Sequence, residues 1–204
     1  FGGSLDARGI ALPSTLFRYG IGDKFELRLQ SDYVMTQFKN GDTEKGMGDI
    51  QFGFKYQMYS KDGTEIAFLS HVSCPSGTAQ PEKSKEWGSI NKIAVSHELT
   101  ENIGIGYNLG YDYINDVSKN GNLFYSLVLG VGVNDKVAFF VETYGDVVEF
   151  ETKQTDEGKG LFAKFDAGVT YAVKDNLQLD MSFGTGINYR YNFISCGVSW
   201  LISK

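Results

Sequence analysis

The feature that most constrains the fold is a pair of long segments, residues 48–59 and 64–74, in which apolar and polar side chains alternate. In the first segment the apolar positions are Ile50, Phe52, Phe54, Tyr56 and Met58. Successive side chains of a β-strand point to opposite faces, so this alternation predicts strands with one apolar and one polar face. The polar turn at residues 60–63 predicts that the two strands form an antiparallel hairpin.

Composition agrees with an all-β chain and excludes several other classes. The 204 residues predict one domain over 1–204, and the net charge of −6 argues against nucleic-acid binding. The longest run without a charge, residues 120–134, has 15 residues, whereas a membrane-spanning helix needs about 20. The two cysteines, Cys74 and Cys196, form neither a disulfide framework nor a metal-ligand cluster, and we expect no metal or cofactor. The sequence begins at Phe1 without a Met, which indicates a processed start or a missing N-terminal part.

Similar segments follow one another along the whole chain. We predict eleven strands, at 11–20, 24–36, 48–59, 64–74, 87–98, 103–114, 122–133, 136–149, 160–172, 177–188 and 191–202. Short turns alternate with longer polar loops, which we place at 38–47, 75–86, 115–121 and 151–160, with a shorter connection near 188–190. Tight turns join adjacent antiparallel strands, so the short turns are expected at one end of the sheet and the loops at the other.

Two architectures fit strands of this kind. A soluble sandwich or barrel places its apolar face inward and has strands of about five or six residues. A transmembrane barrel places its apolar face outward against lipid, with strands of about 9–11 residues, short periplasmic turns and longer external loops. Strand length and the alternation of turns and loops favour the second. We therefore predict an all-β, up-and-down antiparallel transmembrane β-barrel.

The number of strands follows from the order of turns and loops. Bacterial single-chain barrels have an even number of strands. We therefore expect twelve: the eleven strands above and one at or before the N-terminus that ends near Phe1. Residues 2–10 would then belong to the first external loop.

Several motifs carry a family resemblance. Residues 18–20 read RYG and are followed by ELRL at 26–29, residues 48–56 read GDIQFGFKY, and residues 75–77 read PSG. These motifs, with residues 140–142 and 178–180 in later strands, resemble the bacterial outer-membrane transporter-like family named for the meta-pathway of phenol degradation. The resemblance implies an outer-membrane β-barrel with a role in transport, and it implies no catalytic residues.

The polar face of the strands is the candidate functional site. The residues predicted to line the lumen are Arg18, Glu26, Arg28, Asp49, Lys55, Lys92, Asp112, Glu142, Lys164, Asp166 and Asp180. A mixed charged lining could form a pore that selects polar or charged solutes. Alternatively, the charges pair across a small barrel and fill it. Eight strands give a packed interior and sixteen an aqueous channel, so twelve strands leave both possibilities open.

An enzymatic alternative rests on one short motif. His71 and Ser73 form a His-x-Ser sequence that is similar to that of outer-membrane phospholipases and lipid A deacylases, in which the histidine activates the serine hydroxyl. In this chain Cys74 and Pro75 replace the Asn-Gly that follows in those enzymes, and the strand parity turns His71 and Ser73 inward, away from lipid. We therefore predict that the protein is not an enzyme.

These inferences lead to one functional hypothesis and one alternative. We predict a barrel of the bacterial outer membrane that acts as a passive channel or uptake component for small polar or aromatic solutes. The alternative is a non-conducting barrel that serves as a structural or accessory subunit of an outer-membrane complex. The expected partners are outer-membrane lipid and, in the second case, other envelope proteins, with no nucleic acid.

Overall fold

The computed structural model of the protein describes residues 2–3, 7–79, 86–114, 119–151, 153–155 and 159–202. Within these ranges the chain forms β-strands and turns, and no helix in them is long and apolar enough to cross a membrane. Phe1 and parts of the predicted loops at 75–86, 115–121 and 151–160 lie outside the described residues.

The eleven predicted strands are all present. The strands are β1 (Gly2–Gly3), β2 (Ala7–Ile21), β3 (Phe25–Phe38), β4 (Thr43–Met47), β5 (Gln51–Lys61), β6 (Thr64–Ser73), β7 (Gly88–Thr100), β8 (Ile103–Ile114), β9 (Asn122–Gly132), β10 (Val137–Val148), β11 (Gly160–Lys174), β12 (Leu177–Gly186) and β13 (Asn192–Trp200). The predicted and observed ends agree to within a few residues for most strands, because turn chemistry marks the ends of long alternating segments.

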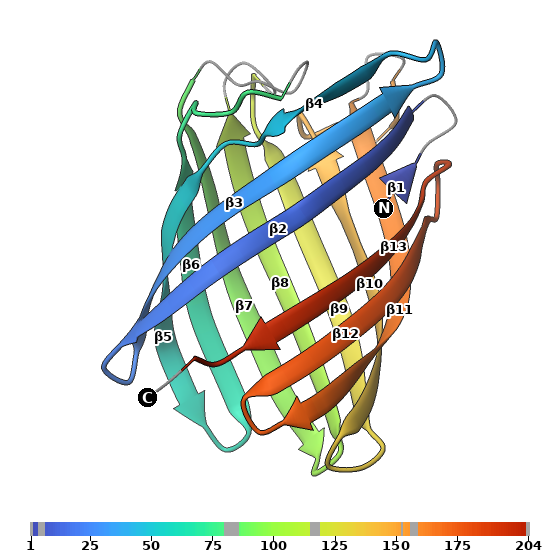
Figure 1. The fold of residues 1–204 in the computed structure, drawn as a ribbon. Helices are drawn as coiled ribbons and strands as arrows, with labels where there is room; N and C mark the ends of the chain where they lie inside the picture. Colours follow the sequence, from blue (N-terminus) through green and yellow to red (C-terminus); the bar gives the residue numbers. More distant parts are fainter. Residues whose placement is uncertain are drawn as a thin grey trace.

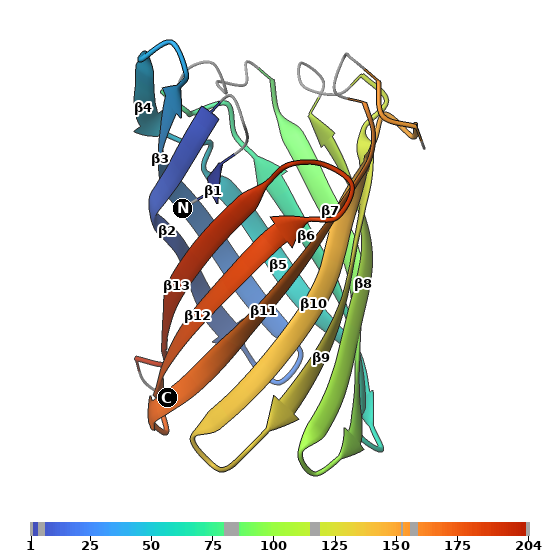
Figure 2. The same cartoon turned by 90° about the vertical axis from the view of Figure 1, so that its right-hand side faces the viewer.

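The strands form one antiparallel up-and-down sheet that curves round into a barrel (Figures 1 and 2). Neighbours in the sheet follow the chain order from β5 to β13, and β3 pairs with both β2 and β5. β1 lies between β2 and β13: Gly2 is opposite Gly9 on one side and Phe193 on the other. It therefore occupies the position that we predicted for the twelfth strand. Figure 1 shows the short turns gathered at the end of the barrel where the C-terminus lies.

Two details differ from the prediction, and one hairpin explains both. β2 begins at Ala7, although residues 7–10 were predicted to belong to an external loop. Ala7–Ala11 pair with Val34–Phe38 and extend the β2–β3 hairpin upward. The predicted loop at 38–47 contains β4, which folds back onto the upper half of β3, from Tyr33 to Gln37. β5 pairs only with the lower half of β3, from Phe25 to Gln30, so β5 starts at Gln51 instead of residue 48.

The apolar face points outward. Among the described residues only three apolar side chains are buried: Ala67, Leu69 and Ala79. Large apolar side chains in mid-strand are exposed instead, for example Leu109 at 62%, Phe52 at 54% and Phe139 at 52%. A soluble protein of this size would bury such residues, whereas a transmembrane barrel presents them to lipid. The arrangement confirms the predicted fold class.

Candidate functional site

The inner face of the barrel can be followed from strand to strand through the register. Residues directly opposite each other in an antiparallel pair place their side chains on the same face. Glu26 is opposite Lys55, Lys55 is opposite Leu69, and Leu69 is opposite Lys92. The same reasoning places ten of the eleven predicted residues on the inner face: Arg18, Glu26, Arg28, Lys55, Lys92, Asp112, Glu142, Lys164, Asp166 and Asp180.

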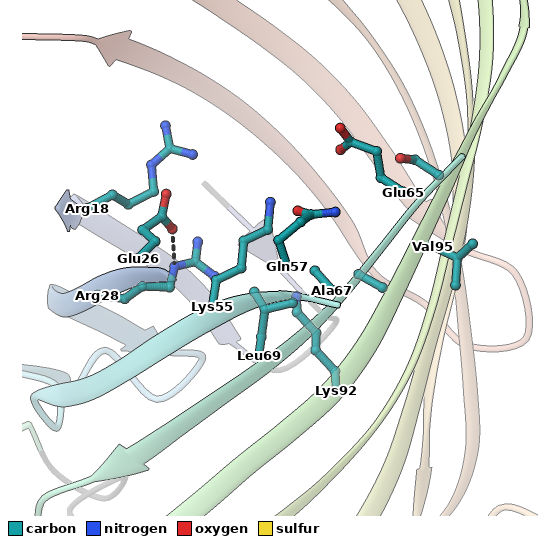
Figure 3. A pocket seen from close by; sticks show the side chains of 12 residues that line it. Arg18, Glu26, Arg28, Lys55, Gln57, Glu65, Ala67, Leu69, Lys92 and Val95 are labelled. Atoms are coloured by element: carbon teal, nitrogen blue, oxygen red, sulfur yellow. Dashed lines mark ion pairs between the residues drawn. The ribbon is translucent and has the colours of Figure 1, made fainter. Parts of the chain in front are cut away.

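The first half of the sheet brings five of these residues to one cavity. Arg18, Glu26, Arg28, Lys55 and Lys92 line a cavity of about 260 Å³ against the wall formed by β2, β3, β5, β6 and β7. Figure 3 shows their side chains together, with those of Glu65 and Gln57. Arg28 Nε lies 3.3 Å from Glu26 Oε1, which are two residues apart on the inward face of β3. Basic side chains outnumber acidic ones in this cavity, and we call its lining the basic wall.

The opposite half of the sheet carries mainly carboxylates. Glu142 on β10 is directly opposite Asp166 on β11, so two acidic side chains are neighbours on the inner face. Asp166 is only 7% exposed, and its Oδ1 has no hydrogen-bond partner among the described residues. Asp112 on β8 accepts a 2.8 Å hydrogen bond from the side-chain amide of Asn122. We call this half, from β8 to β12, the acidic wall.

One cation of the acidic wall is held by a carboxylate and aromatic rings. Lys164 Nζ lies 3.1 Å from Asp146 Oδ2, 5.4 Å from the centre of the Tyr144 ring and 5.9 Å from that of Tyr191. A cation above an aromatic face is attracted by the ring quadrupole. The register places Lys164 directly opposite Tyr144, so the contact follows from neighbouring strands.

An aromatic ladder that was not predicted from the sequence lies beside Lys164. The rings of Tyr189 and Tyr191 are 5.8 Å apart, those of Tyr191 and Phe193 are 5.9 Å apart, and Phe162 packs edge-on against Tyr189 at 5.3 Å. The signal in the sequence was the alternation of Tyr189, Tyr191 and Phe193, of which only Phe193 lies within β13, while the two tyrosines belong to the connection before it. The ladder provides an aromatic surface next to the lumen.

Glycines divide the inner face into filled and bare regions. Gly110, Gly168 and Gly184 are covered by the rings of Phe124, Phe140 and Phe193, respectively. In contrast, an added Cβ at Gly104 or Gly130 would approach no described atom closer than 3.6 or 3.9 Å. The inner surface of β8 and β9 near the short-turn end is therefore bare. Elsewhere the rings of Phe124, Phe140 and Phe193 occupy part of the lumen.

The eleventh predicted residue, Asp49, lies before the start of β5 and joins two of the sequence motifs. Its Oδ1 accepts a 2.7 Å hydrogen bond from the backbone N–H of Gly77, and the backbone N–H of Ile50 donates a 3.0 Å bond to Ser76 Oγ. The GD of residues 48–49 and the PSG of residues 75–77 thus form one joint at the loop end of the barrel. A Cβ on Gly77 would lie 2.8 Å from Asp49 Oδ1, so any larger residue there would force this carboxylate to shift.

We expect Asp49→Ala to destabilise the barrel by about 1–3 kcal/mol, because the N–H of Gly77 loses a charged acceptor. Asp49→Asn keeps a side-chain oxygen at the same position and should retain most of the stability. Thermal unfolding of the purified variants measures the difference. Equal unfolding temperatures for Asp49→Ala and the parent would show that the joint contributes nothing to stability.

The His-x-Ser motif faces inward, as the strand parity predicted. His71 and Ser73 are 8% and 2% exposed, so neither reaches the lipid-facing surface of the barrel. His71 Nε2 has no hydrogen-bond partner among the described residues, and its ring lies against Gly53. A lipid substrate could not reach this pair from the bilayer.

Comparison with known proteins supports the same architecture. The sequence matches the model of a family described as "Putative MetA-pathway of phenol degradation" over residues 7–200. No protein of curated function matches the sequence of this chain.

Several solved structures share the fold. The KdgM porin in complex with disordered oligogalacturonate has a TM-score of 0.66 at 8% identity, with 97% of this chain and 98% of that chain covered. An outer-membrane channel from Pseudomonas putida F1 has a TM-score of 0.67 at 13% identity, with coverage of 90% and 80%. The CymD monoaromatic hydrocarbon channel has a TM-score of 0.55 at 12% identity, with coverage of 98% and 76%. These neighbours are a porin and two channels, and the fold that they share with this chain confirms the predicted β-barrel.

Proposed function

Because the chain belongs to the family named for the MetA pathway of phenol degradation, we propose that it is a passive channel for small polar or aromatic solutes. The observation that carries the proposal is the bare region of the inner face at Gly104 and Gly130, where an added Cβ would meet no close neighbour. Charged and amide side chains recur along the rest of the inner face. A lumen that only needed filling would place large side chains at these positions.

Two features support the proposed class of solute. The charged residues of the basic and acidic walls can replace the hydration of a polar solute along the lumen. The ladder of Phe162, Tyr189, Tyr191 and Phe193 offers stacking faces for an aromatic ring. Two proteins of similar fold are a porin in complex with oligogalacturonate, which is a polar solute, and a channel for monoaromatic hydrocarbons.

One observation favours the alternative of a non-conducting structural barrel. The rings of Phe124, Phe140 and Phe193 lie over inner-face glycines and occupy part of the lumen. If these rings and the wall charges close the passage, the barrel would act through lipid and through other envelope proteins, with the loops available for docking.

Single-channel recording in planar bilayers tests the proposal. We expect discrete conductance steps from the folded protein, and a severalfold lower conductance for Gly130→Trp, since the indole would enter the bare part of the lumen. The matched control is Leu129→Trp at the same depth: Leu129 is exposed on the outer, lipid-facing side and the substitution should leave conductance unchanged. Silence from a barrel shown to be folded would refute the channel and favour the structural alternative.

A further inference from the structure

The cavity on the basic wall carries an excess of positive charge. Its charged residues are four cations, Arg18, Arg28, Lys55 and Lys92, and two carboxylates, those of Glu26 and Glu65. Two positive charges therefore remain uncompensated within the cavity. Glu142 interacts electrostatically with Lys92 from the acidic wall, and one positive charge still remains when it is included.

Most of these cations lack an ion pair. Arg28 is paired with Glu26 at 3.3 Å. Among the described residues, Arg18, Lys55 and Lys92 have no carboxylate within the 4.0 Å of a salt bridge. Lys55 and Lys92 are only partly exposed. Holding partly desolvated like charges together is costly unless a counter-charge is present. The described residues do not provide enough carboxylates to neutralise this cluster.

The side chain of His71, which lies beside Arg28, supplies no negative charge to the cavity. Gly53 is directly opposite both Arg28 and His71, so the imidazole lies next to the arginine on the inner face. His71 is 8% exposed and its Nε2 has no hydrogen-bond partner. The surroundings of Arg28 on this side are thus neutral or positive, and an anion entering the lumen would meet unpaired donors.

We propose that this cavity is an anion-binding subsite whose ligands are small organic carboxylates. The proposal rests on the proposed function, because it names a class of solute for the same lumen. A guanidinium offers a planar pair of donors that matches a carboxylate, and lysine ammonium groups add point charges. The volume of about 260 Å³ is below the roughly 300–1,000 Å³ typical of drug-sized sites. The ligands are therefore small.

Equilibrium dialysis of the detergent-solubilised barrel with radiolabelled benzoate, and with benzamide as the uncharged analogue of similar shape, tests binding directly. We expect benzoate to bind more tightly than benzamide. Lys55→Gln and Lys92→Gln should each weaken benzoate binding roughly tenfold, the effect expected when a charge-assisted hydrogen bond is lost. Glu65→Gln should strengthen it, because it removes one of the two carboxylates of the cavity.

The matched control for charge is Lys61→Gln. Lys61 lies at the short-turn end of β5, its side chain is 71% exposed, and it pairs with Asp62 outside the cavity. Lys61→Gln changes the net charge by the same amount as Lys55→Gln and should leave benzoate binding unchanged. Heat-modifiable migration in gels shows that each variant is folded.

The reversal potential in a potassium chloride gradient gives a second readout. We expect Lys55→Gln and Lys92→Gln to shift the selectivity of the channel toward cations, and Lys61→Gln to leave it unchanged. Equal binding of benzoate and benzamide, or benzoate binding that ignores Lys55→Gln and Lys92→Gln, would overturn the subsite while a conducting barrel would retain its proposed function. Benzoate binding by a folded but silent barrel would support the subsite and overturn the channel.

Discussion

Leu109→Arg is expected to destabilise the barrel by about 2–4 kcal/mol, the cost of placing an arginine on the lipid face near the middle of the bilayer. Leu109 lies near the centre of β8 and is 62% exposed on the outer face. In a soluble protein the same substitution would bring a charge into water and cost little. Denaturant unfolding of the protein in lipid vesicles, followed by tryptophan fluorescence, measures the free energy of unfolding.

The neighbouring Asn108→Arg is the control for this experiment. Asn108 lies on the inner face and donates a 2.6 Å hydrogen bond to Ser126 Oγ. Its replacement should cost only the hydrogen bond, about 0.5–1.5 kcal/mol, because the arginine would face the polar lumen. Equal costs for Leu109→Arg and Asn108→Arg would contradict the assignment of the two faces.

Gly53→Val is expected to cost about 1–3 kcal/mol through overpacking. Gly53 is the third residue of β5, and an added Cβ would collide with the imidazole of His71 and lie 2.5 Å from the carbonyl oxygen of Ser70. The carbonyl belongs to the backbone of β6 and cannot move without disturbing the β5–β6 ladder. Unfolding in denaturant measures the loss, and the basic wall should be disturbed as well, since Arg28 is the direct neighbour of Gly53.

Gly130→Val provides the comparison. An added Cβ at Gly130 would be 3.9 Å from the nearest atom, the carbonyl oxygen of Gly104. Valine also favours extended backbone more than glycine does, so we expect a change within about 0.5 kcal/mol of zero or a slight gain. If Gly53→Val changed the free energy of unfolding as little as Gly130→Val, the close packing of His71 against Gly53 would be contradicted.

Much of the barrel could be predicted because its signals are local. Alternation at 50–58 identifies a strand, and turn residues mark its ends, without reference to distant parts of the chain. The β3–β4 pairing was missed because residues 43–47 are short and polar, and their alternation gave no apolar face. That pairing is decided by the long β2–β3 hairpin, which leaves the upper half of β3 available to a returning segment.

The candidate site was predictable as a set of positions. Strand parity indicated that Arg28, Lys55 and Lys92 share a face, since side-chain direction alternates strictly along a strand. Parity carries no information about depth along the barrel axis, which depends on the stagger of each strand against the next. For that reason the eleven charged residues could be predicted to line the lumen, but those of the cavity could not be distinguished from those of the opposite wall.

The sequence by itself determined a transmembrane barrel with its apolar face toward lipid, because the period of two and the strand length leave few alternatives. Only the tertiary structure decided how the charges are distributed. Cross-strand register brings Arg18, Lys55 and Lys92 to a single cavity and places Glu142 beside Asp166 on the other wall. Each hairpin fixes the stagger of two strands, and these staggers add up round the barrel, so the alternation within one strand does not specify which residues of distant strands become neighbours.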